Sequence, residues 1–189
     1  MRIQRPWRAL FPLVLLLAPL RAGGAEAPAP ASPAQAFFQN LAAHCGKSYE
    51  GKVLFTTSKD FEGQRLVMHV ASCSEKEIRI PFQVGEVRSR TWVLTLEGDR
   101  LRLKHDHRHE DGTPEEVTNY GGDSDDTGTA LRQTFPTDEF TRKLLPHAGG
   151  NAWTLEIDPA AQEFRYSLDR GDEKRFRSSF DLSKPLPAS

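Results

Sequence analysis

The sequence has few of the residues and motifs that usually identify a function. Only two of its 189 residues are cysteine, and it contains no Cys-x-x-Cys, Gly-x-Ser-x-Gly or His-Glu-x-x-His motif. Thiol redox, serine-hydrolase and zinc-protease chemistry therefore have no recognisable signature here. Basic residues are not in excess either, because 25 Lys and Arg stand against 26 Asp and Glu. Nucleic acids and anionic membranes attract basic patches, so the charge balance argues against both as partners.

Residues 1–25 have the pattern of a secretory signal peptide. Three arginines precede the apolar run Ala9–Leu20, and the small residues Gly23-Gly24-Ala25 form a plausible cleavage site. The apolar run is shorter than the roughly 20 residues that a membrane-spanning helix requires. We therefore expect a periplasmic or secreted protein of bacterial type, cleaved near Ala25, with no membrane span and a net charge of about −5 after cleavage.

Cys45 and Cys73 are the only cysteines in a chain that we expect to enter an oxidising compartment. A disulfide between them is the natural prediction for such a setting. By loop entropy, a bond that closes about 28 residues would stabilise the fold by about 3 kcal/mol. Two unpaired buried thiols are the alternative.

The rest of the chain reads as one domain. Residues 26–33 form a Pro- and Ala-rich tether, residues 34–183 form the folded domain, and residues 184–189 form a short tail. Apolar residues recur with helical spacing over 34–44, and Thr137 can cap a second short helix over 137–146. Between and after these segments the apolar residues alternate with polar ones, which is typical of antiparallel strands with one buried face.

About ten such strands predict an up-and-down antiparallel β-barrel, which removes exposed sheet edges by closing on itself. A two-sheet sandwich is the alternative. The expected strands cover 52–57, 65–72, 77–83, 88–97, 100–109, 115–120, 128–135, 151–158, 162–169 and 174–182. In the barrel, helix 34–44 would plug one end, and helix 137–146 would form a lid over the other.

The stretch 87–111 predicts a β-hairpin that turns at Gly98-Asp99, where glycine can take the positive φ of a tight turn. This turn places Trp92 opposite His105, Arg90 opposite His107, and Arg88 opposite His109. The three histidines share one strand parity with Leu101 and Leu103, so we expect them to face the barrel interior. One interior face would then grade from apolar residues to imidazoles and guanidiniums at one end.

These residues suggest a ligand site. Arg90 and His107, with Arg88, Trp92 and His105 nearby, could hold a carboxylate or similar anionic head, because arginine offers a planar fork to an anion. The cavity walls would be apolar, as in most small-molecule sites. The expected wall residues are Phe55, Phe82, Trp92, Leu94, Leu103, Trp153, Phe164, Tyr166 and Phe176.

Other interpretations remain open. His105, His107 and His109 could bind a metal ion or haem, although three imidazoles in a straight row converge poorly and the facing arginines disfavour a cation. His105 or His107 could serve as a general base in an enzyme, since imidazole titrates near neutrality. The protein could also be structural or bind a partner, with its interior filled by side chains. No motif specifies a cofactor.

Three segments carry a family resemblance: SRTWVLT at 89–95, LRLKHDHRHEDGT at 101–113 and TNYGGD at 118–123. They resemble a family of small, secreted, uncharacterised bacterial proteins, a resemblance that implies a periplasmic or secreted setting but no activity. The strand pattern is also similar to that of calycin-type barrels, such as lipocalins, without the lipocalin Gly-x-Trp signature. A fold likeness of this kind does not imply a function.

Overall fold

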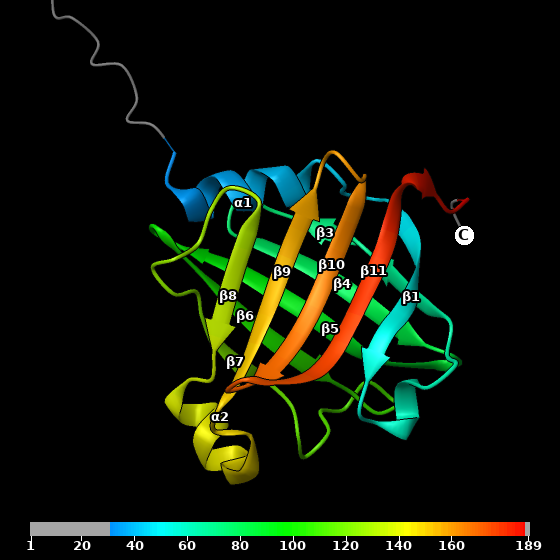
Figure 1. Cartoon of the computed structure of the whole chain (residues 1–189), viewed down its shortest axis with the longest axis vertical. Helices are drawn as coiled ribbons and strands as arrows, with labels where there is room; N and C mark the ends of the chain where they lie inside the picture. Colours follow the sequence, from blue (N-terminus) through cyan, green and yellow to red (C-terminus); the bar gives the residue numbers. More distant parts are fainter. Residues whose placement is uncertain (1–30, 188–189) are drawn as a thin grey trace, which may run out of the picture. The chain divides into compact units, whose positions relative to one another are not determined.

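The computed structural model describes residues 31–187, so the expected signal peptide and most of the tether lie outside the described residues. One antiparallel sheet dominates this part of the chain, with neighbouring strands in the order β7-β6-β5-β4-β2-β1-β11-β10-β9-β8 (Figure 1). The strands are β1 (Ser48–Thr56), β2 (Leu66–His69), β3 (Ser72–Cys73), β4 (Glu77–Val84), β5 (Val87–Glu97), β6 (Arg100–His107), β7 (Tyr120–Asp123), β8 (Arg132–Pro136), β9 (Asn151–Asp158), β10 (Glu163–Arg170) and β11 (Glu173–Pro185). The helical elements are α1 (Pro33–Ala42), η1 (Lys59–Phe61), α2 (Glu139–Leu144) and η2 (Pro146–Ala148).

The sheet curves into a nearly closed barrel, as expected from the strand count. β1 pairs with β11, and the two ends of the strand order, β7 and β8, meet at a seam without a regular ladder. Two backbone bonds cross near this seam, from Asp125 N to Thr134 O and from Asp138 N to Gly121 O, each 2.9 Å long. A Cβ on Gly122 would lie only 1.7 Å from the carbonyl oxygen of Pro136, so this close approach requires glycine.

α1 lies across one end of the barrel (Figure 1). The helix starts with a capping box, in which Ser32 and Gln35 satisfy each other's backbone N–H groups. Its buried side, Phe37, Phe38 and Leu41, belongs to the hydrophobic core of the barrel. Asn40 Nδ2 also donates to Ala130 O at 2.9 Å, which ties the helix to the loop before β8.

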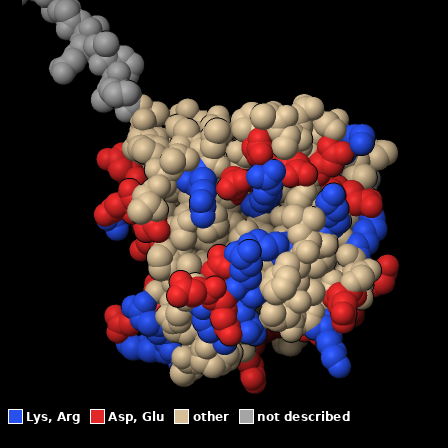
Figure 2. Space-filling model, in the orientation of Figure 1, with Lys and Arg blue, Asp and Glu red and all other residues tan. Residues whose placement is uncertain are grey.

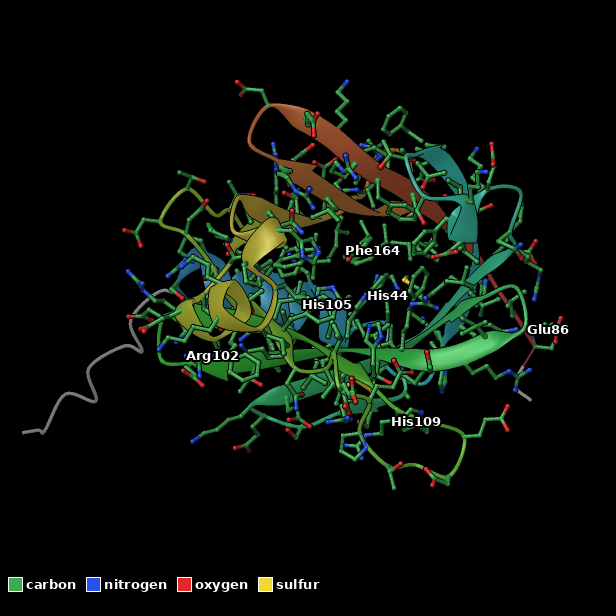
Figure 3. The ribbon with its side chains drawn as sticks, turned by 90° about the horizontal axis from the view of Figure 1, so that it is seen from below. His44, Glu86, Arg102, His105, His109 and Phe164 are labelled. Atoms are coloured by element: carbon green, nitrogen blue, oxygen red, sulfur yellow. A yellow bond between two sulfur atoms is a disulfide. The ribbon has the colours of Figure 1, made fainter. Side chains whose placement is uncertain are left out.

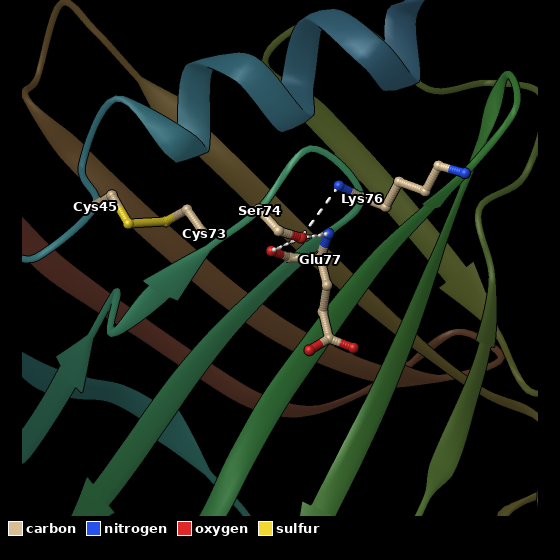
Figure 4. Close-up of a disulfide and its surroundings, with 5 residues drawn as sticks. All are labelled: Cys45, Cys73, Ser74, Lys76 and Glu77. Atoms are coloured by element: carbon tan, nitrogen blue, oxygen red, sulfur yellow. Dashed lines mark hydrogen bonds between the residues drawn. A yellow bond between two sulfur atoms is a disulfide. The ribbon is translucent and has the colours of Figure 1, made fainter.

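The predicted disulfide is present at the α1 end. Cys45, just after α1, is bonded to Cys73 of β3, with the two Cα atoms 6.2 Å apart (Figure 4). Two backbone hydrogen bonds lie beside it, from Gly46 N to Val70 O and from Val70 N to Lys47 O. The disulfide therefore fastens the connection between α1 and β1 to β3, and the two backbone bonds fasten it to the residue that follows β2.

α2 lies at the opposite end (Figure 1), and it begins two residues later and ends two residues earlier than the expected helix 137–146. Asp138, not Thr137, caps it, because the Asp138 carboxylate accepts from Thr141 N. Thr141 in turn exchanges two hydrogen bonds with Gly121 of β7, and Lys104 pairs with Asp138. These contacts dock α2 on the β7–β8 seam, and its role as a lid over the histidines remains a prediction.

The barrel interior is filled mainly by apolar and aromatic side chains. Trp92 stacks between Phe82 and Tyr166, with ring centroids 4.5 and 4.4 Å apart. Phe55 was expected among these wall residues but is 43% exposed, because an irregularity in β1 between Val53 and Phe55 shifts the register. No helix within residues 31–187 is long and apolar enough to cross a membrane.

The outer wall carries charges of both signs. Figure 2 shows acidic and basic side chains interspersed over the face drawn in front. On β9 and β10, Arg165 pairs with Glu156, Asp158 and Glu163 at 2.7 to 3.0 Å. This face therefore offers no large patch of one charge.

Candidate functional site

The β5–β6 hairpin has the predicted register. Gly98 takes a positive φ of 63° at the turn, and the ladder pairs Leu96 with Leu101, Trp92 with His105 and Arg90 with His107. The ladder ends there. The expected pairing of Arg88 with His109 is absent from it, so only two of the three histidines lie on β6.

Arg88 is turned away from the interior by a β-bulge. β4 and β5 pair Phe82 with Arg90 but then Val84 with Val87, so β5 has one residue more than β4 in this interval. Such an extra residue reverses the alternation of faces beyond it. Arg88 is consequently exposed and lines a groove on the outer wall, which corrects its expected place beside Arg90.

His105 is 4% exposed and lies near the centre of the barrel when viewed from the α2 end (Figure 3). Its Nδ1 lies 3.2 Å from Tyr120 O, and its Nε2 lies 2.9 Å from the Tyr166 hydroxyl. A carbonyl can only accept, so Nδ1 carries the proton and Nε2 accepts from Tyr166. Burial lowers the pKa of His105 to about 3, so the ring is neutral near neutral pH.

His107 lies closer to the barrel end and is partly exposed. Its Nε2 is 3.1 Å from the Tyr120 hydroxyl, and its Nδ1 is 3.7 Å from Glu115 Oε2. Burial lowers the pKa of His107, and the nearby positive charge of Arg90 lowers it further. Both imidazoles are thus joined to tyrosine hydroxyls rather than to each other.

His109 lies outside β6, in a turn where its backbone N–H donates to Thr113 O. Figure 3 shows it at the outside of the barrel, away from His105. Among residues 31–187, no group of three or more His, Cys, Asp or Glu side chains is arranged to hold a metal ion. The geometry therefore does not bring the expected three-histidine row together.

Arg90 differs from the other arginines of the described chain. It is partly buried, yet it has no hydrogen bond or ion pair to any of residues 31–187, whereas the other unpartnered arginines, Arg88 and Arg132, are exposed. Its guanidinium lies over the ring of Phe61, 5.6 Å from the centroid. Its charge also acts on the pKa values of His107, Tyr120 and Tyr166, which places it near all three.

Three residues at this end were not predicted as site residues. Tyr120 stacks on His105 with ring centroids 4.7 Å apart, and burial raises its pKa to about 12. Tyr166 was expected only as a wall, although its hydroxyl donates to His105. Phe61, which belongs to η1, packs on Phe176 with ring centroids 4.6 Å apart. Its loop has no strand periodicity in the sequence. Of these three residues, only Tyr166 had a signal in the sequence. The alternation of apolar and polar residues along β10 predicted that Tyr166 faces the interior, but it did not predict its hydrogen bond to His105.

The interior beside His105 is packed. Trp153 lies 5.0 Å from the His105 ring and Tyr166 lies 6.0 Å away, both measured between ring centroids. Four hollows in the described chain, with volumes of about 290 to 600 Å³, are lined by other residues and not by Arg90, His105 or His107. We call the cluster Phe61, Arg90, His107 and Tyr120 the mouth cluster.

No protein-family model matches the sequence, and no curated protein matches it either.

Proposed function

We propose that this protein is an exported β-barrel that binds a small anionic or amphipathic molecule at its mouth cluster. The observation that supports this proposal is Arg90, a partly buried guanidinium with no partner among residues 31–187. Burying a charged group without a partner costs free energy, and a bound anion would offset that cost. The disulfide and the signal-like residues 1–25 support the exported setting.

The surroundings of Arg90 favour an anion over a cation. The guanidinium offers a planar fork to a carboxylate or similar head. His107 and the Tyr120 hydroxyl, 3.1 Å from each other, lie on the neighbouring strands and supply further hydrogen-bonding groups. The carboxylate oxygen Oε2 of Glu115 lies 3.7 Å from His107 Nδ1, and Glu115 makes no ion pair with Arg90.

The packed interior restricts where the rest of the ligand would lie. Trp92, Phe82 and Tyr166 fill the barrel below Arg90, so the apolar part of a ligand would stay outside this interior, against the partly exposed Phe61. Phe61 comes from η1, a single turn on a connecting loop, and it covers Arg90. Displacement of this one side chain would open Arg90 to an anion.

The meander order supports a calycin-type barrel as the finer description of the fold. A structural or partner-binding role is the second candidate, and the filled aromatic interior favours it. In that case Arg90 would be a rim residue without a ligand.

The two candidates can be separated by titration with decanoate, a simple amphipathic anion, followed by native mass spectrometry and calorimetry. We expect saturable binding with a component that Arg90→Gln weakens about tenfold or more, because charged hydrogen bonds contribute about 1.5–3 kcal/mol. Arg132→Gln is the matched control, since Arg132 is an exposed arginine on β8 with no side-chain partner among residues 31–187, and it should leave binding unchanged. Equal loss in both variants, or no binding to the wild type by decanoate or any co-purified acid, would favour the structural role.

A further inference from the structure

A groove of about 310 Å³ lies on the outer wall of the barrel, where β1, β2, β4 and β5 run beside one another. Its polar lining residues are Ser48, Arg65, His69, Gln83 and Arg88. We call it the β2–β4 groove. We propose that it is a second ligand site, separate from the mouth cluster, for a small molecule with an oxyanion head and a short apolar part.

Arg88 reaches this groove because of the bulge in β5. Without the extra residue, Arg88 would share the interior face of Arg90 and Trp92. Bulges commonly re-aim a side chain near a functional site. The re-aimed guanidinium is exposed and has no hydrogen bond or ion pair to any residue of the described chain, so all of its donors are available to a ligand.

Ser48 and His69 form a polar pair directly across the β1–β2 ladder. The Ser48 hydroxyl lies 2.8 Å from His69 Nδ1. When the hydroxyl donates to Nδ1, the ring proton lies on Nε2, which then becomes a donor. In that arrangement the pair presents an N–H group, on the same groove as Arg88, that suits an anionic oxygen.

The charge of the lining is one-sided. Among residues 31–187, no Asp or Glu lines the β2–β4 groove, although acidic residues outnumber basic ones in the sequence as a whole. Arg65 is partly neutralised by Glu50, whose Oε2 accepts from its Nε and Nη2 at 2.8 and 2.6 Å, while its Nη1 remains free of that pairing. The neighbouring groove over β1 and β11, of about 600 Å³, is lined by acidic and basic residues together.

The apolar part of the groove lining favours a ligand that carries a short alkyl chain beside its anionic head. Val67, Pro81 and Leu186 contribute carbon surface next to the basic groups. A bare inorganic ion would use only the polar side, whereas an alkyl phosphate or a short fatty acid would use both. We therefore expect affinity to rise with a short alkyl chain.

NMR of the full folded domain tests this site through the His69 ring. We expect hexyl phosphate to produce saturable chemical-shift changes of the His69 ring and of the β2 amides, because a bound anion changes the electrostatic field and the hydrogen bonding at these groups. Inorganic phosphate should give the same shifts with weaker affinity. Arg88→Gln should weaken hexyl phosphate binding about twofold to fivefold, the upper part of the range expected for one exposed charged contact.

Two control variants keep the outcome interpretable. Arg132→Gln removes another exposed arginine that has no side-chain partner in the part of the chain that the structure describes, and it should leave the His69 response unchanged. Arg90→Gln should also leave it unchanged, which separates this site from the mouth cluster. Absence of saturable His69 shifts, or an equal loss in Arg88→Gln and Arg132→Gln, would overturn the proposal.

Discussion

The two ends of the barrel differ in what their side chains do. At the α1 end, the helix buries Phe37 and Leu41 almost completely, and a disulfide fastens the chain beside it. At the mouth, histidine and tyrosine rings meet a guanidinium that has no partner in the described chain. One end is built from groups that stabilise the fold, whereas the other retains groups that cost stability.

A His–Tyr pair at each end makes the difference specific. His44 Nδ1 lies 2.7 Å from the Tyr49 hydroxyl at the α1 end, and His105 Nε2 lies 2.9 Å from the Tyr166 hydroxyl toward the mouth. Burial lowers the pKa of both histidines, but His44 is partly exposed and His105 is buried. The same pair of residue types therefore has a more strongly lowered histidine pKa inside the barrel than at the α1 end.

The largest change in the free energy of unfolding should come from removing a buried side chain at the α1 end. Phe37→Ala removes a fully buried ring from the core, and phenylalanine truncations of this kind cost about 3–5 kcal/mol through lost burial and the remaining cavity. Urea unfolding measures this loss. Phe140→Ala, on α2 and 52% exposed, is the matched control and should change stability by less than about 0.5 kcal/mol. Similar losses at both positions would remove the contrast between the ends.

The second effect is a pH dependence that arises at His105. Its pKa is about 3 when folded and about 6.5 when unfolded, so below pH 6.5 the unfolded chain binds a proton that the folded chain does not. Stability should therefore fall as the pH drops from 6.5 toward 3, by a few kcal/mol in total, at about 1.4 kcal/mol per pKa unit. Above pH 6.5 this contribution is constant.

His105→Leu should flatten this part of the stability profile when urea unfolding is repeated across the pH range. His44→Leu is the control at the other end, and it should flatten the profile much less because His44 is less buried. A wild-type profile that His105→Leu leaves unchanged would contradict a neutral, buried imidazole.

The third effect concerns the disulfide. Replacing both Cys45 and Cys73 with serine should cost about 3 kcal/mol, the loop-entropy value for a separation of 28 residues. Reduction of the wild type should produce a matching loss in urea unfolding. Decanoate binding at the mouth should remain, since the bond lies at the opposite end. A loss near zero would mean that the neighbouring Gly46–Val70 and Val70–Lys47 backbone bonds hold this connection without it.

The fold was largely predictable because strand alternation is a local property. The pairing of Arg90 with His107 followed from one turn at Gly98. The bulge at Arg88 was not predictable, since an extra residue in β5 leaves the local alternation of residue types unchanged and depends on its fit to β4. The expected strand 115–120 proved to be β7 at Tyr120–Asp123, where Gly121 and Gly122 allow the close seam with β8.

The candidate site was less predictable than the fold for a related reason. The hydrogen bond between Tyr166 and His105 joins residues 61 positions apart, and it depends on closure of the barrel. The row of three histidines failed at His109, because β6 ends at His107 and the chain turns outward. Periodicity identifies which face a residue shares, whereas the partners across the interior depend on the curvature of the whole sheet.

The smallest effect gives the sharpest test of the mouth. Arg90→Met keeps the length of the side chain but removes a charge that has no partner among residues 31–187, so stability should stay the same or rise by up to about 1 kcal/mol. Arg102→Met is the matched comparison, because Arg102 pairs with Asp123 at 2.6 Å and with Glu97 at 2.7 Å on the outer wall. That variant should lose up to about 1 kcal/mol, as is usual for surface ion pairs. If urea unfolding instead showed Arg90→Met to be the more destabilised of the two, Arg90 would be a structural residue, and the mouth would be built for stability as the α1 end is.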